Sequence, residues 1–448
     1  MTTGLSPPQH PHRCQLHNEV HARPPEALRA PLAITHLVML TDAAGREASR
    51  AHLAGFLSDH HLPPPDTRTT HLRADLGAFR IRWELHTEFV TWTFMVTPVD
   101  DIFAADERGP MVALEAVARD WLAALPGECL CALHLWVSAG EGSAPVRRRW
   151  LHEESLVAAT VADGHAEVYT DFAIHADGFS RMLLVDKGLS PQRLGRLIQQ
   201  LLEIETYRMA ALLGLPAARE ASSTLAQAEG ELAELAHAIR HSNRDAEPLL
   251  LDRLTRLAGQ VEGQYAATHS RFSASSAYFE LVDRRIQDIA ESRLSDFQTI
   301  GEFMERRLSP ARSTCAWATR RQNALSERVS RMSSLLRTRV EIEQQQNNQA
   351  LLASMNRRGD LQLKLQSTVE GLSVAAITYY IVGLVSYLAK AAMALGWPYS
   401  PESTAAAAIP VVATSVWWSL RRLHHRMFGH TPALAVATDT RASGPSQP

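Results

Sequence analysis

Two long stretches with almost no charge, near the C-terminus, dominate the hydrophobic pattern of the chain. Residues 371–401 carry a single charge, at Lys390, and residues 403–420 carry none. A helix crosses the apolar core of a bilayer with about 20 apolar residues. The pattern therefore predicts transmembrane helices over residues 371–396 and 403–421, joined by a short loop. The alternative, a pair of buried core helices, fits uncharged runs of this length less well.

Basic residues flank this apolar pair at both of its outer ends. They are Arg357, Arg358 and Lys364 before the first stretch, and Arg421, Arg422 and Arg426 after the second. Arginine and lysine near membrane helices collect on the cytoplasmic side. Both termini are therefore expected in the cytoplasm, with the helices forming a hairpin. The tail over residues 430–448 lacks apolar periodicity and is expected to be disordered.

One face of the first predicted membrane helix is small and hydroxylated. Its residues recur at spacings that place them on one stripe: Ser373, Tyr380, Gly383, Tyr387 and Lys390. Such a stripe suits close contact between helices, and it would also suit the wall of a narrow pore. We favour packing, because a ring of lysines would oppose cations in a pore.

Residues 217–370 are poor in glycine and proline and rich in good helix formers, which predicts a helical stalk. An apolar stripe marks its first helix: Leu225, Ala228, Leu232 and Leu235. A second helix should begin near Pro248. A third should begin at Ser309-Pro310, an N-cap residue followed by a first-turn proline. From residue 311 to 369 it would run for about 90 Å into the membrane. We expect a coiled coil and a homo-oligomer.

Residues 1–216 alternate between two periodicities and predict an α+β domain. β-branched and aromatic runs predict strands over residues 32–40, 79–94, 129–137, 166–174 and 180–186. Helical spacing marks residues 43–60, 111–125 and 191–214, the last ending at Gly214 and Pro216. The N-terminal residues have no apolar core and do not resemble a secretory signal. The domain is therefore expected in the cytoplasm.

Charge and cysteine content exclude two classes of function. The net charge of −3 disfavours nucleic acid as a partner. The four cysteines are too scattered for a zinc site, so we expect reduced thiols, with Cys129 and Cys131 on one face of a strand.

Phosphate loops, nucleophile elbows and the deaminase signature are missing, so an ordinary enzyme is not indicated.

The segment "HNEVH" is the candidate for metal chemistry. In an extended strand, alternate side chains share one face, so His17, Glu19 and His21 would point together. Two histidines and a carboxylate bind iron or zinc, so a divalent metal is a possible cofactor, although none is expected. Glu84, His86 and Glu88 repeat the spacing, and His86 could join the first group. The favoured alternative is a rigid segment, stiffened by Pro24 and Pro25, that docks on the domain.

Five motifs in order give the chain a family resemblance: "LHNEVHARP", "WELHTEFVTWTF", "LLEIETYRMAALLGLP", "ALLASMNRR" and "LQSTVEGLSVAAITYYIVGLVSYLAK". With them the chain resembles the bacterial membrane-anchored proteins of domain-of-unknown-function family 3422. The resemblance covers nearly the whole chain. It implies a multi-pass protein of the bacterial inner membrane and carries no established activity.

The layout is also similar, more loosely, to CorA-type cation channels, which would imply a ring of subunits. Those channels have a Gly-Met-Asn motif after the first membrane helix, where this chain has "AMALGWPYSPES".

The leading hypothesis is a membrane-anchored oligomer with a scaffolding, sensing or interaction role. Its partners would be the lipid bilayer, further copies of the chain and an unknown protein. The alternatives are a CorA-like channel or transporter, and a metal-dependent enzyme that uses "HNEVH".

Overall fold

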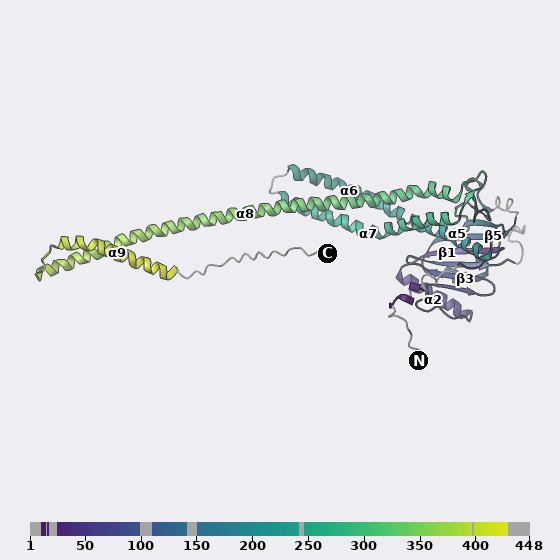
Figure 1. The fold of residues 1–448 in the computed structure, drawn as a ribbon, viewed down its shortest axis with the longest axis horizontal. Helices are drawn as coiled ribbons and strands as arrows, with labels where there is room; N and C mark the ends of the chain where they lie inside the picture. Colours follow the sequence, from purple (N-terminus) through teal and green to yellow (C-terminus); the bar gives the residue numbers. More distant parts are fainter. Residues whose placement is uncertain are drawn as a thin grey trace, which may run out of the picture. The chain divides into compact units, whose positions relative to one another are not determined.

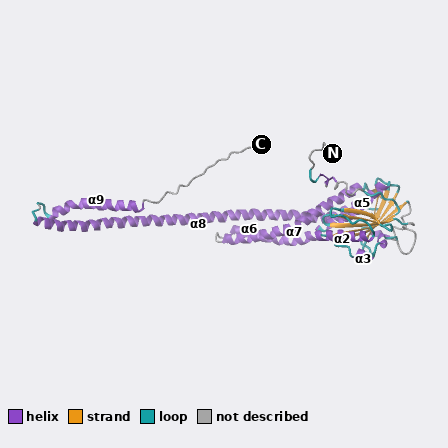
Figure 2. Cartoon of the chain, turned by 90° about the horizontal axis from the view of Figure 1, so that it is seen from below, coloured by secondary structure: helices purple, strands orange, loops and turns teal. Residues whose placement is uncertain are grey.

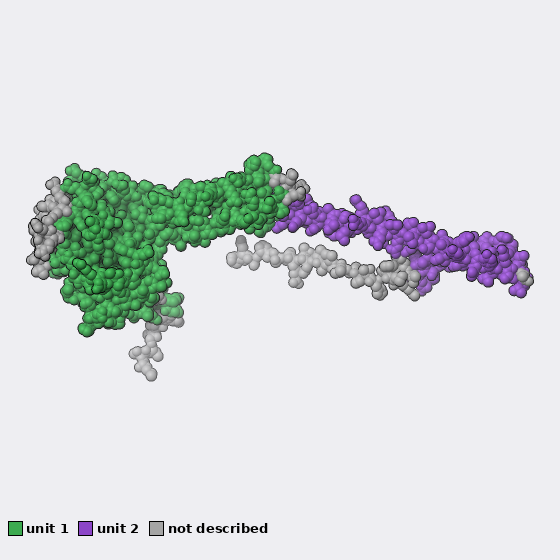
Figure 3. Space-filling view, turned by 180° about the vertical axis from the view of Figure 1, so that it is seen from behind, with its two compact units in different colours: residues 1–337 green, residues 338–448 purple. Residues whose placement is uncertain are grey.

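A computed structural model describes residues 10–14, 16–17, 25–98, 110–140, 150–241, 246–396 and 398–428 (Figure 1). The chain divides into two compact units, residues 1–337 and residues 338–448 (Figure 3).

A nine-stranded sheet lies in the first unit, with the strand order β2-β3-β4-β1-β5-β8-β7-β6-β9. The strands are β1 Leu32–Leu40, β2 His71–Asp75, β3 Arg80–Leu85, β4 Phe89–Val96, β5 Glu128–Ala139, β6 Val157–Val161, β7 Ala166–Thr170, β8 Ser180–Asp186 and β9 Ser292–Arg293. Of these strand pairs, β5 and β8 run parallel and the others antiparallel.

Long helices follow the sheet strands along the chain. The helices are α2 Ala43–Asp59, α3 Arg119–Ala123, α5 Pro191–Leu212, α6 Gly214–His241, α7 Glu247–Asp288, α8 Ile300–Ala394 and α9 Pro401–Phe428, with 3-10 turns η1 Ala113–Ala116 and η2 Glu153–Ser155. The chain therefore has an α/β sheet domain followed by long helices, as the sequence predicts in outline.

The alternation of side chains along β1 explains how both faces of the sheet are covered. Leu32 and Ile34 belong to a core that α5 completes, whereas Leu37 and Met39 belong to a core that α2 completes. Successive strand residues point to opposite faces, so one strand contributes side chains to both cores. Figure 2 shows α5 and α2 on opposite sides of the sheet. The core beneath α5 also takes residues from α7 and α8: Phe279, Val282, Ile300, Met304, Leu308 and Ala311.

The single strand predicted over residues 79–94 is wrong, because this segment is a hairpin. The chain turns after Leu85, and the His86 amide donates a hydrogen bond to the Phe89 carbonyl at 2.9 Å. β3 and β4 then pair antiparallel, with Leu85 opposite Val90. The aromatic run conceals a turn that contains no glycine, proline or asparagine.

The two cysteines of β5 do not share a face, so that prediction is also wrong. The pairing of β1 with β5 shifts register between Val38 and Met39, which pair with Cys131 and Cys129. Such a bulge inserts an extra residue and ends strict alternation. Cys131 is buried, Cys129 is exposed, and all four cysteines are free thiols. Burial raises the pKa of the Cys131 thiol well above its ordinary value, and the Glu205 charge raises it further.

The helix predicted over residues 191–214 ends at Leu212, close to the expected end, but the chain does not leave the helical state there, since α6 begins at Gly214. A Cβ atom on Gly214 would lie 2.6 Å from Ser275 Oγ. The glycine therefore allows α6 to approach α7 closely.

The third long helix begins at Ile300, and Pro310 lies inside it, which corrects the predicted start at Ser309-Pro310. Thr299 Oγ1 accepts from the Glu302 amide at 3.2 Å, while Glu302 accepts from the Thr299 amide at 3.1 Å. This reciprocal pair is a capping box, which satisfies amides that have no partner within the helix. The carboxylate of Glu291 accepts from the next two amides, those of Ile300 and Gly301. The helix is therefore fixed at its true start.

The predicted apolar stripe of α6 is buried within the chain. Leu225, Leu232 and Leu235 pack with residues of α7 and of the first part of α8, including Leu254 and Leu325. Across this bundle, Arg321 donates two hydrogen bonds to the Glu229 carboxylate, from Nε at 2.7 Å and from Nη2 at 2.6 Å. The stripe therefore serves contacts inside one chain.

The segment at residues 25–30 crosses α5 at Gly195. Leu28 N donates to Pro191 O at 2.9 Å, and Glu26 pairs with Arg80 at 2.6 Å. A Cβ atom on Gly195 would lie 1.7 Å from the Glu26 carbonyl oxygen. The absence of a side chain at this position therefore permits the crossing.

Replacing Gly195 by alanine should destabilise the folded chain by about 1–3 kcal/mol, because the helix and the crossing segment must separate. Helix propensity alone would favour alanine by about 1 kcal/mol. Gly55→Ala in α2 is the matched control, since a Cβ there meets no atom within 4 Å. Denaturant unfolding of the full chain in detergent measures both. Equal stability of the two variants would contradict the close crossing.

Candidate functional site

Two helices in the described part of the chain are long and apolar enough to cross a membrane. One is α8, within Ile300–Met393, and the other is Pro401–Arg422 of α9, and their apolar windows are 6% and 0% buried. Large apolar side chains are correspondingly exposed, among them Leu372, Ile377, Leu384, Leu388, Ile409 and Val411. Exposed apolar surfaces of this extent are typical of protein or membrane contact.

Arginine and tryptophan pair at the end of the second apolar segment. The Arg421 guanidinium lies 4.9 Å from the Trp417 ring centroid, and that of Arg422 lies 5.1 Å from Trp418. Aromatic rings beside arginine are typical of the boundary between membrane and water. The other predicted flanking charges, Arg357, Arg358 and Lys364, are exposed on α8, and Arg426 lies in α9.

The predicted polar stripe lies on α8, and much of it is exposed. Tyr380 and Tyr387 are each 75% exposed, and Lys390 Nζ lies 5.8 Å from the Tyr387 ring. Ser373 and Gly383 are half-buried. The packing role of this stripe stays a prediction.

The residues predicted around "HNEVH" are placed only in part. His17 is exposed, while Glu19 and His21 lie outside the described residues. His86 lies in the turn after β3, with its ring 4.5 Å from that of Phe89. A metal site at these residues stays a prediction.

The partner residues Glu84 and Glu88 do not share a strand face with His86, because the hairpin turns between them. Glu84 is buried in β3, with its carboxylate 3.8 Å from Arg82. Glu88 accepts hydrogen bonds from Arg271 at 2.9 Å and Tyr278 at 3.0 Å, both on α7. Glu88 thus connects the hairpin to the helices.

A buried ion pair lies between α5 and the sheet. Both Glu205 carboxylate oxygens accept from Arg208, at 2.6 and 3.0 Å, and Ser180 Oγ donates to Glu205 at 3.1 Å. The side chains are 2% and 14% exposed for Glu205 and Arg208. Burial alone would lower the pKa of Arg208, but attraction to Glu205 raises it above its ordinary value.

His36 of β1 is held as a neutral imidazole by hydroxyl groups on both sides. Its Nε2 lies 3.0 Å from Thr206 Oγ1, and its Nδ1 lies 2.8 Å from Thr93 Oγ1. Thr206 already donates its proton to the Leu202 carbonyl, so it accepts from His36 Nε2–H. Burial, followed by the charges of Arg82 and His86, lowers the pKa of His36 to about 3.

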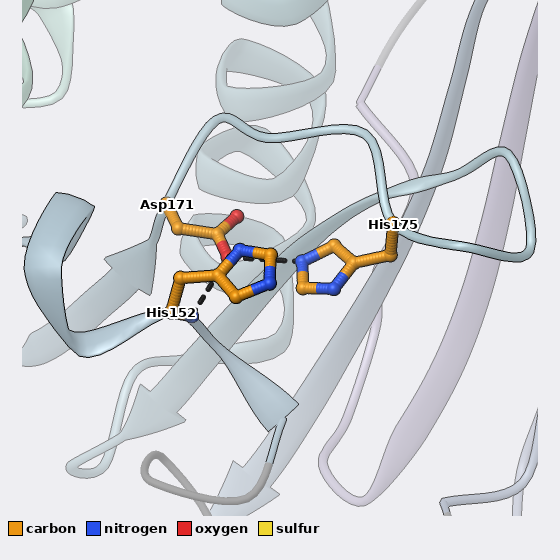
Figure 4. Close-up of side chains that lie close together, drawn as sticks. All are labelled: His152, Asp171 and His175. Carbon is orange, nitrogen blue, oxygen red and sulfur yellow. Dashed lines mark hydrogen bonds and ion pairs between the residues drawn. The ribbon is translucent and has the colours of Figure 1, made fainter.

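A cluster of two histidines and a carboxylate lies where β6 begins and β7 ends (Figure 4). Asp171 Oδ2 lies 2.9 Å from His175 Nε2 and 3.2 Å from His152 Nδ1. The Asp171 side chain is 0% exposed, that of His175 8% and that of His152 60%. The two imidazole rings stack with centroids 4.5 Å apart.

The sequence prediction missed this cluster because His152 precedes β6, whereas Asp171 and His175 lie in the connection after β7. The pairing of Val157 with Thr170 brings the segment before β6 beside the segment after β7. One signal was local: Asp171 and His175 are four residues apart, just before the turn at Asp177-Gly178.

These features define a class of protein with an α/β sheet domain, long helices and two candidate membrane spans near the C-terminus. The chain belongs to the family described as Protein of unknown function (DUF3422), which matches residues 8–427. The predicted family resemblance is therefore confirmed. No curated protein matches the chain. No solved structure matches it either, and the architectural likeness to CorA channels is unsupported.

Proposed function

We propose that this protein is anchored in the bacterial inner membrane by a hairpin of the α8 end and α9, with both termini in the cytoplasm. Its sheet domain and helical bundle would serve a scaffolding, sensing or interaction role at the membrane surface. The observation that carries the proposal is the exposure of the two apolar segments, of which 6% and 0% is buried.

The charges on either side of the apolar segments support the orientation. Arg357, Arg358 and Lys364 precede the first segment, and Arg421 and Arg422 follow the second. Basic residues at both outer ends favour a hairpin whose turn lies on the far side of the membrane.

Exposed leucines on α8, before the membrane segment and at its start, support assembly with a second copy of the chain. Leu361, Leu365 and Leu372 are 57%, 67% and 67% exposed. Their spacings of four and seven residues place them on one face of the helix. A parallel coiled coil between copies would cover them.

Two arginines in the first apolar segment should release the protein from the membrane. Each arginine at the centre of a membrane helix costs about 2.5–3.5 kcal/mol of insertion free energy. We expect Ile377→Arg with Leu384→Arg to lower the fraction that resists a carbonate wash. The control, Leu351→Arg with Leu361→Arg, changes two equally apolar residues of α8 outside that segment and should leave the fraction unchanged.

Recovery of the unaltered chain in the soluble fraction without detergent would overturn the membrane proposal. The mass of the same protein in detergent, from light scattering, tests assembly separately. A mass of one chain per particle would remove the oligomer and leave the anchor intact.

A further inference from the structure

We propose that His152, Asp171 and His175 bind a divalent transition-metal ion of the zinc class. The ligands would be two imidazole nitrogens and one carboxylate oxygen. This site is independent of the membrane anchor and of the "HNEVH" segment.

The distances from Asp171 to the two histidine nitrogens fit one ion. Two ligands that each lie about 2.1 Å from a metal are about 3.0 Å apart at a right angle and about 3.4 Å apart at the tetrahedral angle. Asp171 Oδ2 lies 2.9 and 3.2 Å from the two histidine nitrogens. These nitrogens lie within 4.8 Å of each other. The His152 ring, whose side chain is 60% exposed, would have to turn out of its stack with His175 to aim its nitrogen at the ion.

The electrostatic surroundings of Asp171 favour a cation. Its carboxylate is completely buried, and a buried carboxylate needs a compensating positive charge. The carboxylate contacts two backbone amides and two imidazoles. A divalent ion supplies the charge while both imidazoles stay neutral, which is the form that binds metals.

The carboxylate is held in place before any ion arrives. Asp171 Oδ1 accepts from Ala173 N at 3.1 Å, and Oδ2 accepts from His152 N at 2.9 Å. The next residue, Phe172, has a φ of 52° and packs against Phe303, with ring centroids 4.7 Å apart. Hydrogen bonds of this kind orient metal ligands and strengthen binding.

The second histidine-bearing segment is also tied to the sheet. Arg181 of β8 donates to the Trp150 carbonyl at 3.2 Å and pairs with Asp177 at 2.8 Å. His152 and His175 therefore stand on connections joined to one strand. The exposed side of His152 leaves a coordination position for water or another small ligand, as in zinc sites with three protein ligands.

Metal binding by the full chain in detergent tests the proposal. Protein stripped with a chelator is dialysed against Zn²⁺ for stoichiometry and titrated with Co²⁺ for its absorption bands. We expect one ion per chain. His152→Ala, at an exposed position that the core does not need, should weaken binding at least about 10-fold. Zn²⁺ should raise the unfolding temperature of the parent chain and not that of the variant.

Two control variants test whether metal binding belongs to the proposed site or to other histidines. His237→Ala with His241→Ala removes another stacked histidine pair, on α6, and should bind as the parent chain does. His17→Ala should do the same. Unchanged binding by His152→Ala, loss of binding in either control, or a parent chain that takes up no metal would each overturn the assignment.

Discussion

Replacing Glu205 by glutamine should destabilise the folded chain by about 3 kcal/mol or more. The change leaves the Arg208 guanidinium buried between α5 and the sheet without an anion, and breaking a buried ion pair from one side costs about 3–5 kcal/mol. Glutamine keeps the side-chain volume of Glu205 and one hydrogen-bond acceptor. The loss of stability therefore measures the effect of removing the negative charge. Denaturant unfolding of the full chain in detergent, followed by tryptophan fluorescence, measures it.

An exposed pair provides the control. Arg256 and Asp252 on α7 are 69% and 60% exposed, and such pairs contribute about 0–1 kcal/mol. Asp252→Asn should therefore change stability little. Replacing Glu205 and Arg208 together by methionine should recover much of the lost stability, because no unpaired charge remains. A cost for Glu205→Gln as small as that of Asp252→Asn would contradict the burial of the pair.

Acid should destabilise the sheet through His36. The pKa of His36 is about 3 in the folded chain and about 6.5 in the unfolded chain. Between these values the unfolded chain binds more protons, so stability is full above pH 6.5 and is lost as the pH falls. The loss approaches about 1.4 kcal/mol per pH unit, or about 3 kcal/mol by pH 4.

His36→Gln should reduce the slope of the unfolding free energy against pH by the amount that corresponds to about one bound proton. His134, whose pKa burial lowers to about 4, keeps its own contribution in that variant. His269→Gln replaces an exposed imidazole on α7 and should leave the slope of the parent chain. The free energy of unfolding, measured from pH 8 to pH 4, distinguishes the His36 variant from the His269 variant. The same slope in the His36→Gln chain would show that His36 is not held neutral.

Sequence periodicity predicted the helices and strands whose regularly spaced apolar residues are buried. β1, residues 32–40, alternates between two cores, and α5 buries Leu194, Leu197, Leu201 and Leu202 on one stripe. Sequence reasoning did not find β2, β6 or β9, which are five, five and two residues long and too short to show a period. It also placed a helix start at Ser309-Pro310 and did not consider the capping box of Thr299 and Glu302, ten residues earlier, where the structure begins the helix.

The candidate sites divide in the same way. The apolar segments are local features, so composition alone located them. The His152, Asp171 and His175 cluster depends on strand pairing, which spacing along the chain does not encode. The equal spacing of Glu84, His86 and Glu88 suggested a shared face, but a turn at residues 86–88 separates them. Spacing carries meaning only once the element is known.

The core beneath α5 has a consequence for biosynthesis. That core includes Phe279, Ile300 and Met304, and β9 at Ser292–Arg293 pairs with β6. The sheet domain therefore cannot complete its folding when its last long strand, β8, leaves the ribosome. It must wait for more than a hundred further residues, at about 5–20 residues per second. The first apolar segment follows about 60 residues later, so completion of the sheet and delivery to a membrane would be separated by only seconds.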